Sequence, residues 1–321
     1  MGRTVSSAPT AYPPCWNGLM EMTRVDRITI PADLLMRSEG TTGRVHSVFG
    51  RGLNLFTQGR LIHVQWEREL RSPFSLALND TSPIRLQESI KEGDEVVKGD
   101  GRFRIGMGEW IRYAPKELYD PCIHPATEIS ESKLEQMSKF LIGEMEDLRE
   151  RIPSLSFLVE TEAIIKSQTE GLLACLRKWN LRFQLLREYT GRLIGLGPGL
   201  TPMGDDFLIG ILGALSLFRS YSKKIEDFFK NLREAITEQV NGTCAISSEF
   251  LLYATQSCFS EKINNLLTFF SQRKLEEEKL KKTIQNAFDF GSTSGIGNLL
   301  GIYNGLRIFS ALRQNGEEEN G

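Results

Sequence analysis

The chain has 321 residues, of which 40% are hydrophobic and 25% charged, and its formal net charge is −2. With so small a net charge, the composition gives no reason to expect nucleic acid or an anionic membrane as a partner. The apolar run Phe207–Phe218 is shorter than the roughly 20 residues that span a bilayer, so we expect no membrane segment.

The beginning of the chain lacks the apolar core of a signal peptide, and we expect residues 1–22 to be a disordered lead-in. The cysteines are odd in number, lie at scattered spacings and include no CxxC pair. This pattern favours reduced thiols over a disulfide framework or a zinc site, and it predicts a cytoplasmic protein. The cysteines are Cys15, Cys122, Cys175, Cys244 and Cys258.

Residues 23–125 are expected to form a β-rich N-terminal domain. Short runs of β-branched and aromatic residues alternate there with turn-forming residues, which predicts an antiparallel, β-barrel-like unit. Gln58-Gly59 predicts a hairpin turn, and residues 90–101 carry two more turn signals. The predicted strands are Arg27–Ile30, Gly43–Phe49, Leu53–Phe56, Leu61–Trp66, Phe74–Leu78, Ile84–Leu86 and Phe103–Ile105.

Beyond the proline-rich stretch Pro115–Pro125, the hydrophobic period becomes that of helices. We therefore predict a mainly α-helical domain over residues 126–314, with Ser130 as a cap, and a flexible tail over residues 315–321. The fold class is α+β. The predicted helices are Ser130–Arg151, Ser154–Lys166, Glu170–Arg187, Met203–Arg219, Lys224–Val240, Ala245–Ser257, Lys262–Phe270, Leu275–Phe288 and Ile296–Leu312.

A glycine-rich loop, Gly195–Asp206, interrupts the helical pattern. A cluster of glycines indicates unusual backbone angles or close approach to a ligand. Exposed N–H groups at a glycine-rich helix start bind anions, so we predict a ligand site here. A tight connector is the structural alternative, because the loop has neither a dinucleotide fingerprint nor a P-loop lysine. The candidate binding residues are Gly197, Gly199, Thr201 and Gly204.

Asp205 and Asp206, in the first turn of the following helix, allow two interpretations. They can simply interact with the helix dipole, which is worth about 0.3–1 kcal/mol. Alternatively, they bind a cation, hold an amide N–H or move a proton, and we predict them as the catalytic residues. Their metal requirement is left open, and Mg2+ is compatible with them. The histidines follow no ligand spacing and are expected to be structural; they are His46, His63 and His124.

A second loop, Gly291–Gly295, precedes another apolar helix and forms a faint repeat of the first. In this register Asp206 faces Gly297 and Ala214 faces Gly305. The small residues let the two helices pack closely, which predicts that both loops share one pocket. A third segment, Thr243–Ser248, either joins this pocket or caps its own helix. The further candidate binding residues are Thr243, Ser247, Ser292, Thr293, Ser294 and Gly295.

The loop sequences GLGPGLTPMGDDFLIG (195–210), TCAIS (243–247) and GSTSGIGNLLGIYNGL (291–306) resemble the AllH-like family. The N-terminal SVFGRGLNLFTQGRLIHV (47–64) falls in the same family order. The resemblance implies a subunit of oxamate carbamoyltransferase that acts on a small anionic substrate in allantoin or purine nitrogen catabolism. It also implies FdrA-like and AllG-like partner subunits. Two positions depart from the family pattern: Met203 replaces a small polar residue and Gly297 an acid.

Two other functions remain open from the residues alone. The loops of a non-catalytic assembly subunit would hold an anion or a carboxylate without turnover. A metal-assisted hydrolase or lyase of a small amide would use Asp205 and Asp206 as ligands, and Asp205→Asn would then abolish its metal requirement.

Overall fold

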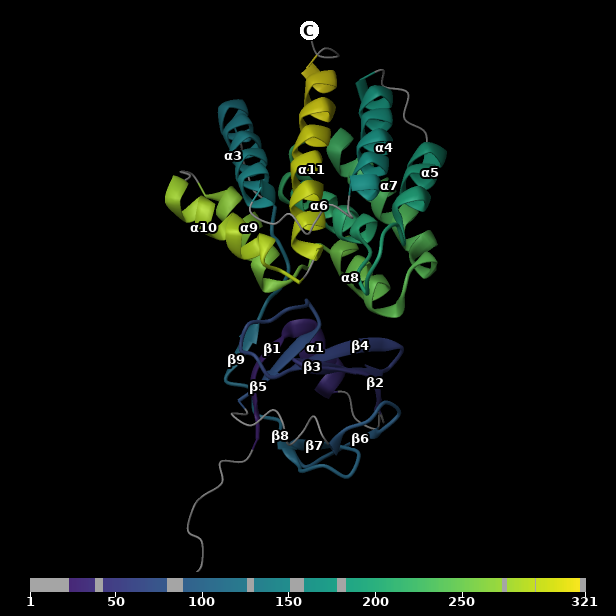
Figure 1. Cartoon of the computed structure of the whole chain (residues 1–321), viewed down its shortest axis with the longest axis vertical. Coiled ribbons are helices and arrows are strands. Elements are labelled where there is room, and N and C mark those ends of the chain that lie inside the picture. The colour runs from purple at the N-terminus through teal and green to yellow at the C-terminus, as the bar shows by residue number, and fades with distance from the viewer. Residues whose placement is uncertain are drawn as a thin grey trace, which may run out of the picture.

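The computed structural model divides into a β-rich unit and a helical unit (Figure 1). The α+β fold class is thereby confirmed. No helix within the described part of the chain is long and apolar enough to cross a membrane. The structure describes residues 23–37, 43–79, 89–125, 130–150, 159–177, 183–272, 276–291 and 293–317.

The β-rich unit is one curled, nine-stranded sheet in the order β8-β7-β6-β2-β3-β4-β5-β1-β9. The sheet curls so that its edge strand β8 reaches the segment before β1, where the Arg112 amide donates to the Thr23 carbonyl oxygen at 2.9 Å. The strands are β1 (Val25–Thr29), β2 (Gly43–Phe49), β3 (Gly52–Thr57), β4 (Arg60–Gln65), β5 (Ser75–Leu78), β6 (Glu95–Gly99), β7 (Arg102–Ile105), β8 (Ile111–Arg112) and β9 (Glu117–Tyr119).

The sheet is mixed, whereas we predicted an antiparallel one. β1 pairs with β9, and β4 with β5, in parallel. Side-chain alternation along a strand does not report the direction of its neighbour, so the pattern carried no signal for these pairs. The predicted hairpin turn is confirmed, since Gln58 and Gly59 both have positive φ between β3 and β4.

Three strands and one helix were missed by the sequence patterns. β6 lies between two turns that were predicted, at Gly93 and at Asp100-Gly101, which have positive φ. β8 and β9 are very short and gain order from their partners in the sheet. Helix α1 (Ile30–Arg37) has Pro31 in its first turn, where proline needs no amide hydrogen. The predicted strand Ile84–Leu86 lies outside the described residues.

His63 on β4 predicts a pH dependence of stability. Burial, aided by the charge of Arg71, lowers the pKa of His63 to about 4. The unfolded chain, with a pKa near 6.5, therefore binds the proton first, and stability falls as pH drops from about 6.5 to 4. We expect the free energy of unfolding to fall by up to about 3 kcal/mol over this window. Chemical denaturation at a series of pH values measures this loss. His63→Gln should flatten the curve, and exposed His124→Gln should not; equal curves for both variants would contradict the assignment.

The helical unit is built around α6, in which every residue is buried. α6 and α11 pack against each other more extensively than any other two elements, and α7, α8 and α9 also contact α6. The helices are α3 (Glu131–Glu150), α4 (Val159–Arg177), α5 (Phe183–Leu193), α6 (Met203–Phe218), α7 (Lys223–Gln239), α8 (Ala245–Thr255), α9 (Glu261–Ser271), α10 (Glu277–Phe288) and α11 (Ser294–Glu317), with a short 3-10 turn at Val240–Gly242.

One predicted helix boundary was wrong. We predicted separate helices over Ser154–Lys166 and Glu170–Arg187, but α4 runs without a break through residues 166–170. Polar residues there suggested an end. In the structure, Thr169 is buried and its hydroxyl donates to the Ile165 carbonyl oxygen at 2.8 Å, which is compatible with a continuing helix. The chain then begins a separate helix, α5, at Phe183.

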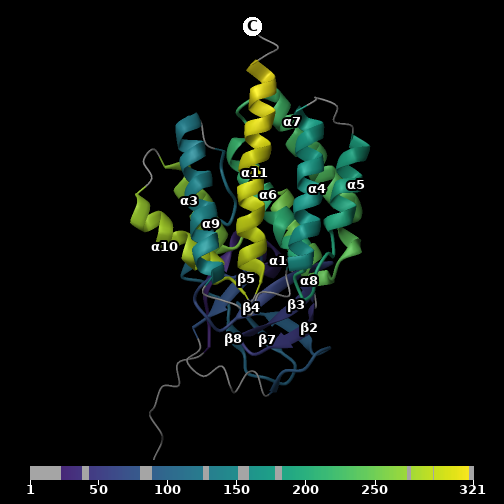
Figure 2. The same cartoon turned by 45° about the horizontal axis from the view of Figure 1, so that its top comes forward.

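Charged and aromatic side chains join the two units. Figures 1 and 2 place α8 at the end of the helical unit that faces the sheet. Arg60 of β4 pairs with buried Glu249 of α8 at 2.5 Å and lies 4.4 Å from the ring centroid of Tyr253. Phe74, just before β5, packs against Phe250 and Tyr253. These contacts of α8 therefore attach the helical unit to the sheet.

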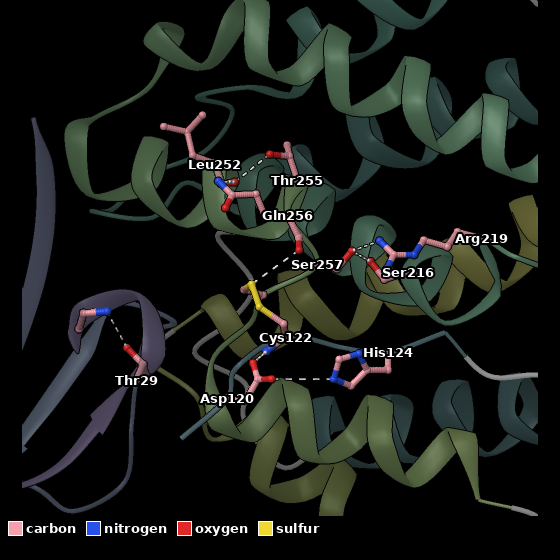
Figure 3. The surroundings of a disulfide bond; sticks show 12 residues. Thr29, Asp120, Cys122, His124, Ser216, Arg219, Leu252, Thr255, Gln256 and Ser257 are labelled. Atoms are coloured by element: carbon pink, nitrogen blue, oxygen red, sulfur yellow. Dashed lines mark hydrogen bonds and ion pairs between the residues drawn. A yellow bond between two sulfur atoms is a disulfide. The ribbon is translucent and has the colours of Figure 1, made fainter. Parts of the chain in front are cut away.

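A disulfide joins Cys122 and Cys258 beside this junction (Figure 3), so the prediction that the cysteines are reduced thiols was wrong for this pair. The two residues are 136 positions apart. Backbone pairing brings them together: the Ile123 amide donates to the Ser257 carbonyl oxygen at 2.8 Å. Cysteine spacing contains no information about such a long-range contact. Cys175 and Cys244 are free, and Cys15 lies outside the described residues.

Candidate functional site

Helices α6 and α11 approach each other closely through their glycines. A Cβ added at Gly210 would collide with the Asn298 carbonyl oxygen and lie 2.8 Å from the Gly301 Cα. A Cβ at Gly305 would lie 2.6 Å from that of Ala214. The close packing and the register predicted from the sequence repeat are therefore confirmed. The consequence for the site is that both helices begin side by side.

The repeat is also visible in the loops that precede the two helices. Gly195 follows α5 and Gly291 follows α10, and both have positive φ, near +76° and +68°. A Cβ at Gly204 would collide with the last carbonyl of α5, and one at Gly295 with the last carbonyl of α10. Two helix–loop–helix units of the same design thus place their second helices in contact.

The glycine-rich loop presents backbone N–H groups at the surface. Gly197 and Gly199 have φ near +106° and +107°, a region that L side chains rarely adopt. Leu200 between the glycines and the helix is 60% exposed. No hydrogen bond from the amides of Gly197, Gly199, Leu200 or Thr201 occurs within the described part of the chain. These amides and the start of α6 form a surface suited to an anion.

Thr201 and Ser294 connect the two helix starts. Their hydroxyl oxygens lie 2.7 Å apart, within hydrogen-bonding distance. Ser294 is 8% exposed, and Thr293 precedes it at the start of α11. Ser292 was also predicted as a binding residue of this loop, and it lies outside the described residues. The hydroxyl pair therefore joins the glycine-rich loop to the start of α11.

Asp205 holds three segments together. Its Oδ1 accepts a hydrogen bond from the Gly195 amide at 2.8 Å, and its Oδ2 accepts from the hydroxyls of Thr243 and Ser247 at 2.6 Å each. Burial raises the pKa of the Asp205 carboxyl, and the three donors counteract that rise. The segment before α8 therefore contributes its hydroxyls to the carboxylate at the start of α6. These contacts place Thr243 and Ser247 beside the glycine-rich loop.

Asp206, in the first turn of α6, is 2% exposed. Burial raises its pKa well above the ordinary value, while the facing side chains of Ser294, Thr201 and Asn298 lower it and the neighbouring Asp205 raises it further. Its Oδ2 has no hydrogen-bond partner within the described residues. A carboxyl group buried in this way favours its neutral form, because an unpaired buried charge is costly.

Gly297 and Met203 lie in contact where α6 and α11 begin. A Cβ at Gly297 would lie 2.7 Å from that of Asp206, so any side chain at 297 requires the helices to move apart. Met203 is fully buried and its side chain lies beside Gly297. Gly297 and the buried side chain of Met203 therefore pack against each other.

Two polar residues near Asp206 were missed by sequence reasoning. Asn298 of α11 is 2% exposed, and its Nδ2 donates to the Ser294 carbonyl oxygen at 2.7 Å. Ser260, between α8 and α9, is 4% exposed. Asn298 had a signal that we overlooked, since it is a polar residue four positions after Ser294 on the buried face of an apolar helix. Ser260 had none, because only the tertiary fold brings it to the site.

The site residues include no basic side chain of their own. Lys, Arg and His are absent from residues 193–206, 240–249 and 291–299. Within these segments, any positive potential therefore comes from the N–H groups and the starts of the two helices. Among the described residues, no three His, Cys, Asp or Glu side chains form a group able to hold a metal ion.

Comparison with protein families identifies two regions of the chain. Residues 193–306 match the model described as oxamate carbamoyltransferase subunit AllH. Residues 25–115 match the AllH family N-terminal domain. No curated protein and no solved structure matches the chain. The two family matches together span well over half of the sequence and include both glycine loops and the β-rich unit. The chain therefore belongs to the AllH family.

Proposed function

We propose that this protein is a subunit of an oxamate carbamoyltransferase and that the adjoining starts of α6 and α11 bind its substrates. The observation that carries the proposal is the contact between Thr201 and Ser294, which unites two helix starts next to loop amides that have no hydrogen-bond partner among the described residues. The family description supplies the reaction type. A place in allantoin or purine nitrogen catabolism follows from the same substrates.

The proposed reaction joins oxamate to the carbamoyl group of carbamoyl phosphate. The oxamate nitrogen attacks the carbamoyl carbon, the carbon–oxygen bond to phosphate breaks, and phosphate leaves with the electron pair. The proton lost by the nitrogen ends on phosphate, so the products are oxalurate and hydrogen phosphate. Such a reaction requires hydrogen-bond donors for the phosphate and for the negative charge that develops on the carbamoyl oxygen during attack.

Two sets of donors in the loops suit these requirements. The amides of Gly197, Gly199 and Leu200 are assigned to the phosphate, because helix starts and glycine loops bind dianions. The hydroxyls of Thr201 and Ser294 are assigned to the amide group of oxamate. Asp206 faces both hydroxyls from below and orients them. This orientation adds to catalysis by fixing the geometry of attack.

Asp205 receives a different role from the one predicted. Since both of its oxygens already accept hydrogen bonds from internal donors, we assign it to hold the glycine-rich loop and the Thr243–Ser247 segment. It acts on the substrate only through these residues, as a positioning residue.

A non-catalytic, anion-binding assembly subunit is the second candidate. The observation in its favour is the lack of Lys, Arg and His in the three segments that form the site. A carbamoyltransferase of this design must gain its cationic group from another chain, and FdrA-like and AllG-like subunits are the proposed partners. If the chain were only a binding subunit, it would still bind anions. Turnover of the assembled enzyme would then not depend on the hydroxyls of Thr201 and Ser294.

Ligand-induced stabilisation and reconstituted turnover test the proposal. We expect carbamoyl phosphate or oxamate to raise the thermal midpoint of the full chain, by the equivalent of about 2.7 kcal/mol at 100 times Kd. Thr201→Val should remove this shift, whereas Thr237→Val, at an exposed position of α7, should retain it. With the partner subunits added, Thr201→Val should also reduce kcat at least ~10-fold. Unchanged turnover combined with lost binding would favour the assembly subunit, and unchanged binding would exclude the site.

A further inference from the structure

The Cys122–Cys258 disulfide lies in the connection between the two units (Figure 3). Cys122 follows β9, on the segment that leads into the helical unit, and Cys258 lies in the turn between α8 and α9, residues 256–260. Cys175 and Cys244, the other cysteines of the described chain, are free. The bridge is therefore part of no larger disulfide framework among the described residues, and it acts on one turn.

The backbone register places the two cysteines directly opposite each other. The amide of the residue after Cys122 donates to the Ser257 carbonyl oxygen at 2.8 Å, and the amide of the residue after Cys258 donates to the Pro121 carbonyl oxygen at 3.0 Å. The cysteines thus form a non-hydrogen-bonded antiparallel pair, whose Cα atoms typically lie ~4.5 Å apart, whereas disulfides most often join Cα atoms ~5.5–6 Å apart. A disulfide across this pairing is expected to be reduced more easily than an unstrained one.

A dithiol reductant can reach one of the two sulfurs. Cys122 is half-buried and Cys258 is 4% exposed, so the thiolate of the reductant attacks the Cys122 sulfur. The sulfur–sulfur bond breaks, and the Cys258 sulfur leaves with the electron pair and takes up a proton. The second thiolate of the reductant then displaces Cys122 as a thiol, and the reductant becomes a disulfide. Two electrons and two protons thereby pass to the protein, and an oxidised dithiol reverses the reaction.

The α8–α9 turn contacts both units. On the sheet side, Glu261, directly after the turn, pairs with the Arg27 guanidinium at 2.9 Å and accepts from the Leu70 amide at 2.8 Å. On the helical side, the Ser216 hydroxyl of α6 donates to the Ser257 hydroxyl oxygen at 3.0 Å (Figure 3). Ser257 has a φ of 66°, which residues other than glycine rarely adopt. The turn therefore keeps its conformation through its surroundings, of which the disulfide is one part.

The same turn lies against the start of α6. Cys258, Phe259 and Ser260 line one small space together with Thr201 and Asp206 of the candidate site. Close-packed interiors transmit displacements from one side chain to the next. A movement of the turn would therefore reach the residues that hold the helix starts in place.

We propose that Cys122 and Cys258 form a reversible thiol–disulfide switch. As a disulfide, the pair clamps the segment between the two units onto the α8–α9 turn. As two thiols, it leaves the backbone hydrogen bonds on either side to hold these segments together, and the turn loosens together with the start of α6. The effect on substrate affinity rests on the proposed function, whereas the loosening itself does not.

Hydrogen exchange of the full chain, with and without dithiothreitol and without denaturant, is the first test. Both cysteines should become reactive toward a thiol reagent while the chain stays folded. Exchange of residues 201–206 and 256–260 should then rise at least ~10-fold, and exchange of residues 225–236 in α7 should not change. A bond that is reduced only in denaturant, a chain that unfolds throughout on reduction, or unchanged exchange in the reduced chain would each overturn the switch.

Variants assign the response to this cysteine pair. Cys122→Ser reproduces the reduced state at a half-buried position, and it should show the faster exchange without reductant and no further response to dithiothreitol. Cys175→Ser is the matched control, because Cys175 is a free cysteine of intermediate exposure, and it should respond as the parent does. A Cys122→Ser variant that exchanges like the oxidised parent would contradict the proposal.

Ligand binding in the two redox states separates the switch from the proposed function. Reduction should weaken the apparent affinity for carbamoyl phosphate or oxamate at least ~5-fold, measured from the midpoint shifts. If neither state binds these ligands while exchange still responds to reduction, the carbamoyl transfer fails and the switch at the turn stands. Equal affinities in both states would overturn the coupling between the turn and the site.

Discussion

Gly301→Ala is expected to destabilise the protein by about 2–3 kcal/mol, near the upper end of typical overpacking effects. The added methyl group would collide with the Phe207 carbonyl oxygen and lie 2.9 Å from the Gly210 Cα. Because these neighbours are backbone atoms, no side chain can rotate away, and the two helices must separate. Chemical denaturation of the purified chain measures the loss.

Exposed helical glycines provide the control. A Cβ at Gly143 in α3 or at Gly171 in α4 would meet nothing within 4 Å. Alanine there should stabilise the chain by about 0.5–1 kcal/mol, since glycine is a poor helix former. The prediction thus has opposite signs for chemically identical substitutions. A Gly301→Ala variant as stable as Gly171→Ala would show that α6 and α11 are not in close contact.

The same variant tests the site, because the helix starts are positioned by this packing. If α6 and α11 separate at Gly301, the Thr201–Ser294 contact at their ends should weaken as well. We expect the midpoint shift caused by carbamoyl phosphate or oxamate to decrease in Gly301→Ala and to remain unchanged in Gly171→Ala.

The part of the site built by local sequence was predictable. The pairing of Gly210 with Gly301 and of Ala214 with Gly305 followed from a repeat in the sequence, since small residues at helical spacing define one packing face. Positive φ at Gly197 and Gly199 followed from the clustering of glycines. Each of these features depends on residues close together within a helix–loop–helix unit, and the two copies of that unit can be compared directly in the sequence.

The remaining features depend on distant segments. Ser260 comes near Asp206 only because the turn after α8 folds against α6. The Cys122–Cys258 disulfide requires the strand after β9 to pair with that same turn. The parallel pairing of β4 with β5 likewise depends on how the intervening loop returns, which no strand pattern encodes.

Asp205→Ala is expected to have the largest effect on stability of any substitution in the site, a loss of about 3–4 kcal/mol. It removes the acceptor for the Gly195 amide and for the hydroxyls of Thr243 and Ser247. Hydrogen bonds to charged groups are worth about 1.5–3 kcal/mol each, and donors left unpaired inside the protein retain their desolvation cost. Partial exposure of Thr243 lets water replace one contact, so the sum is smaller than three full bonds.

Asp205→Asn separates the role of hydrogen bonding from that of charge. Its amide oxygen can still accept from the Gly195 amide, and hydroxyls can rotate to accept from its amide nitrogen. Since burial of the Asp205 carboxyl raises its pKa, the charge itself is unfavourable there, and we expect a loss of only about 1 kcal/mol. Hydrogen exchange of residues 195–200 should increase in the alanine variant and stay near the parent rate in asparagine. Equal losses in both variants would mean that Asp205 acts through its charge and not as a hydrogen-bond acceptor, which would contradict the assignment of a positioning role.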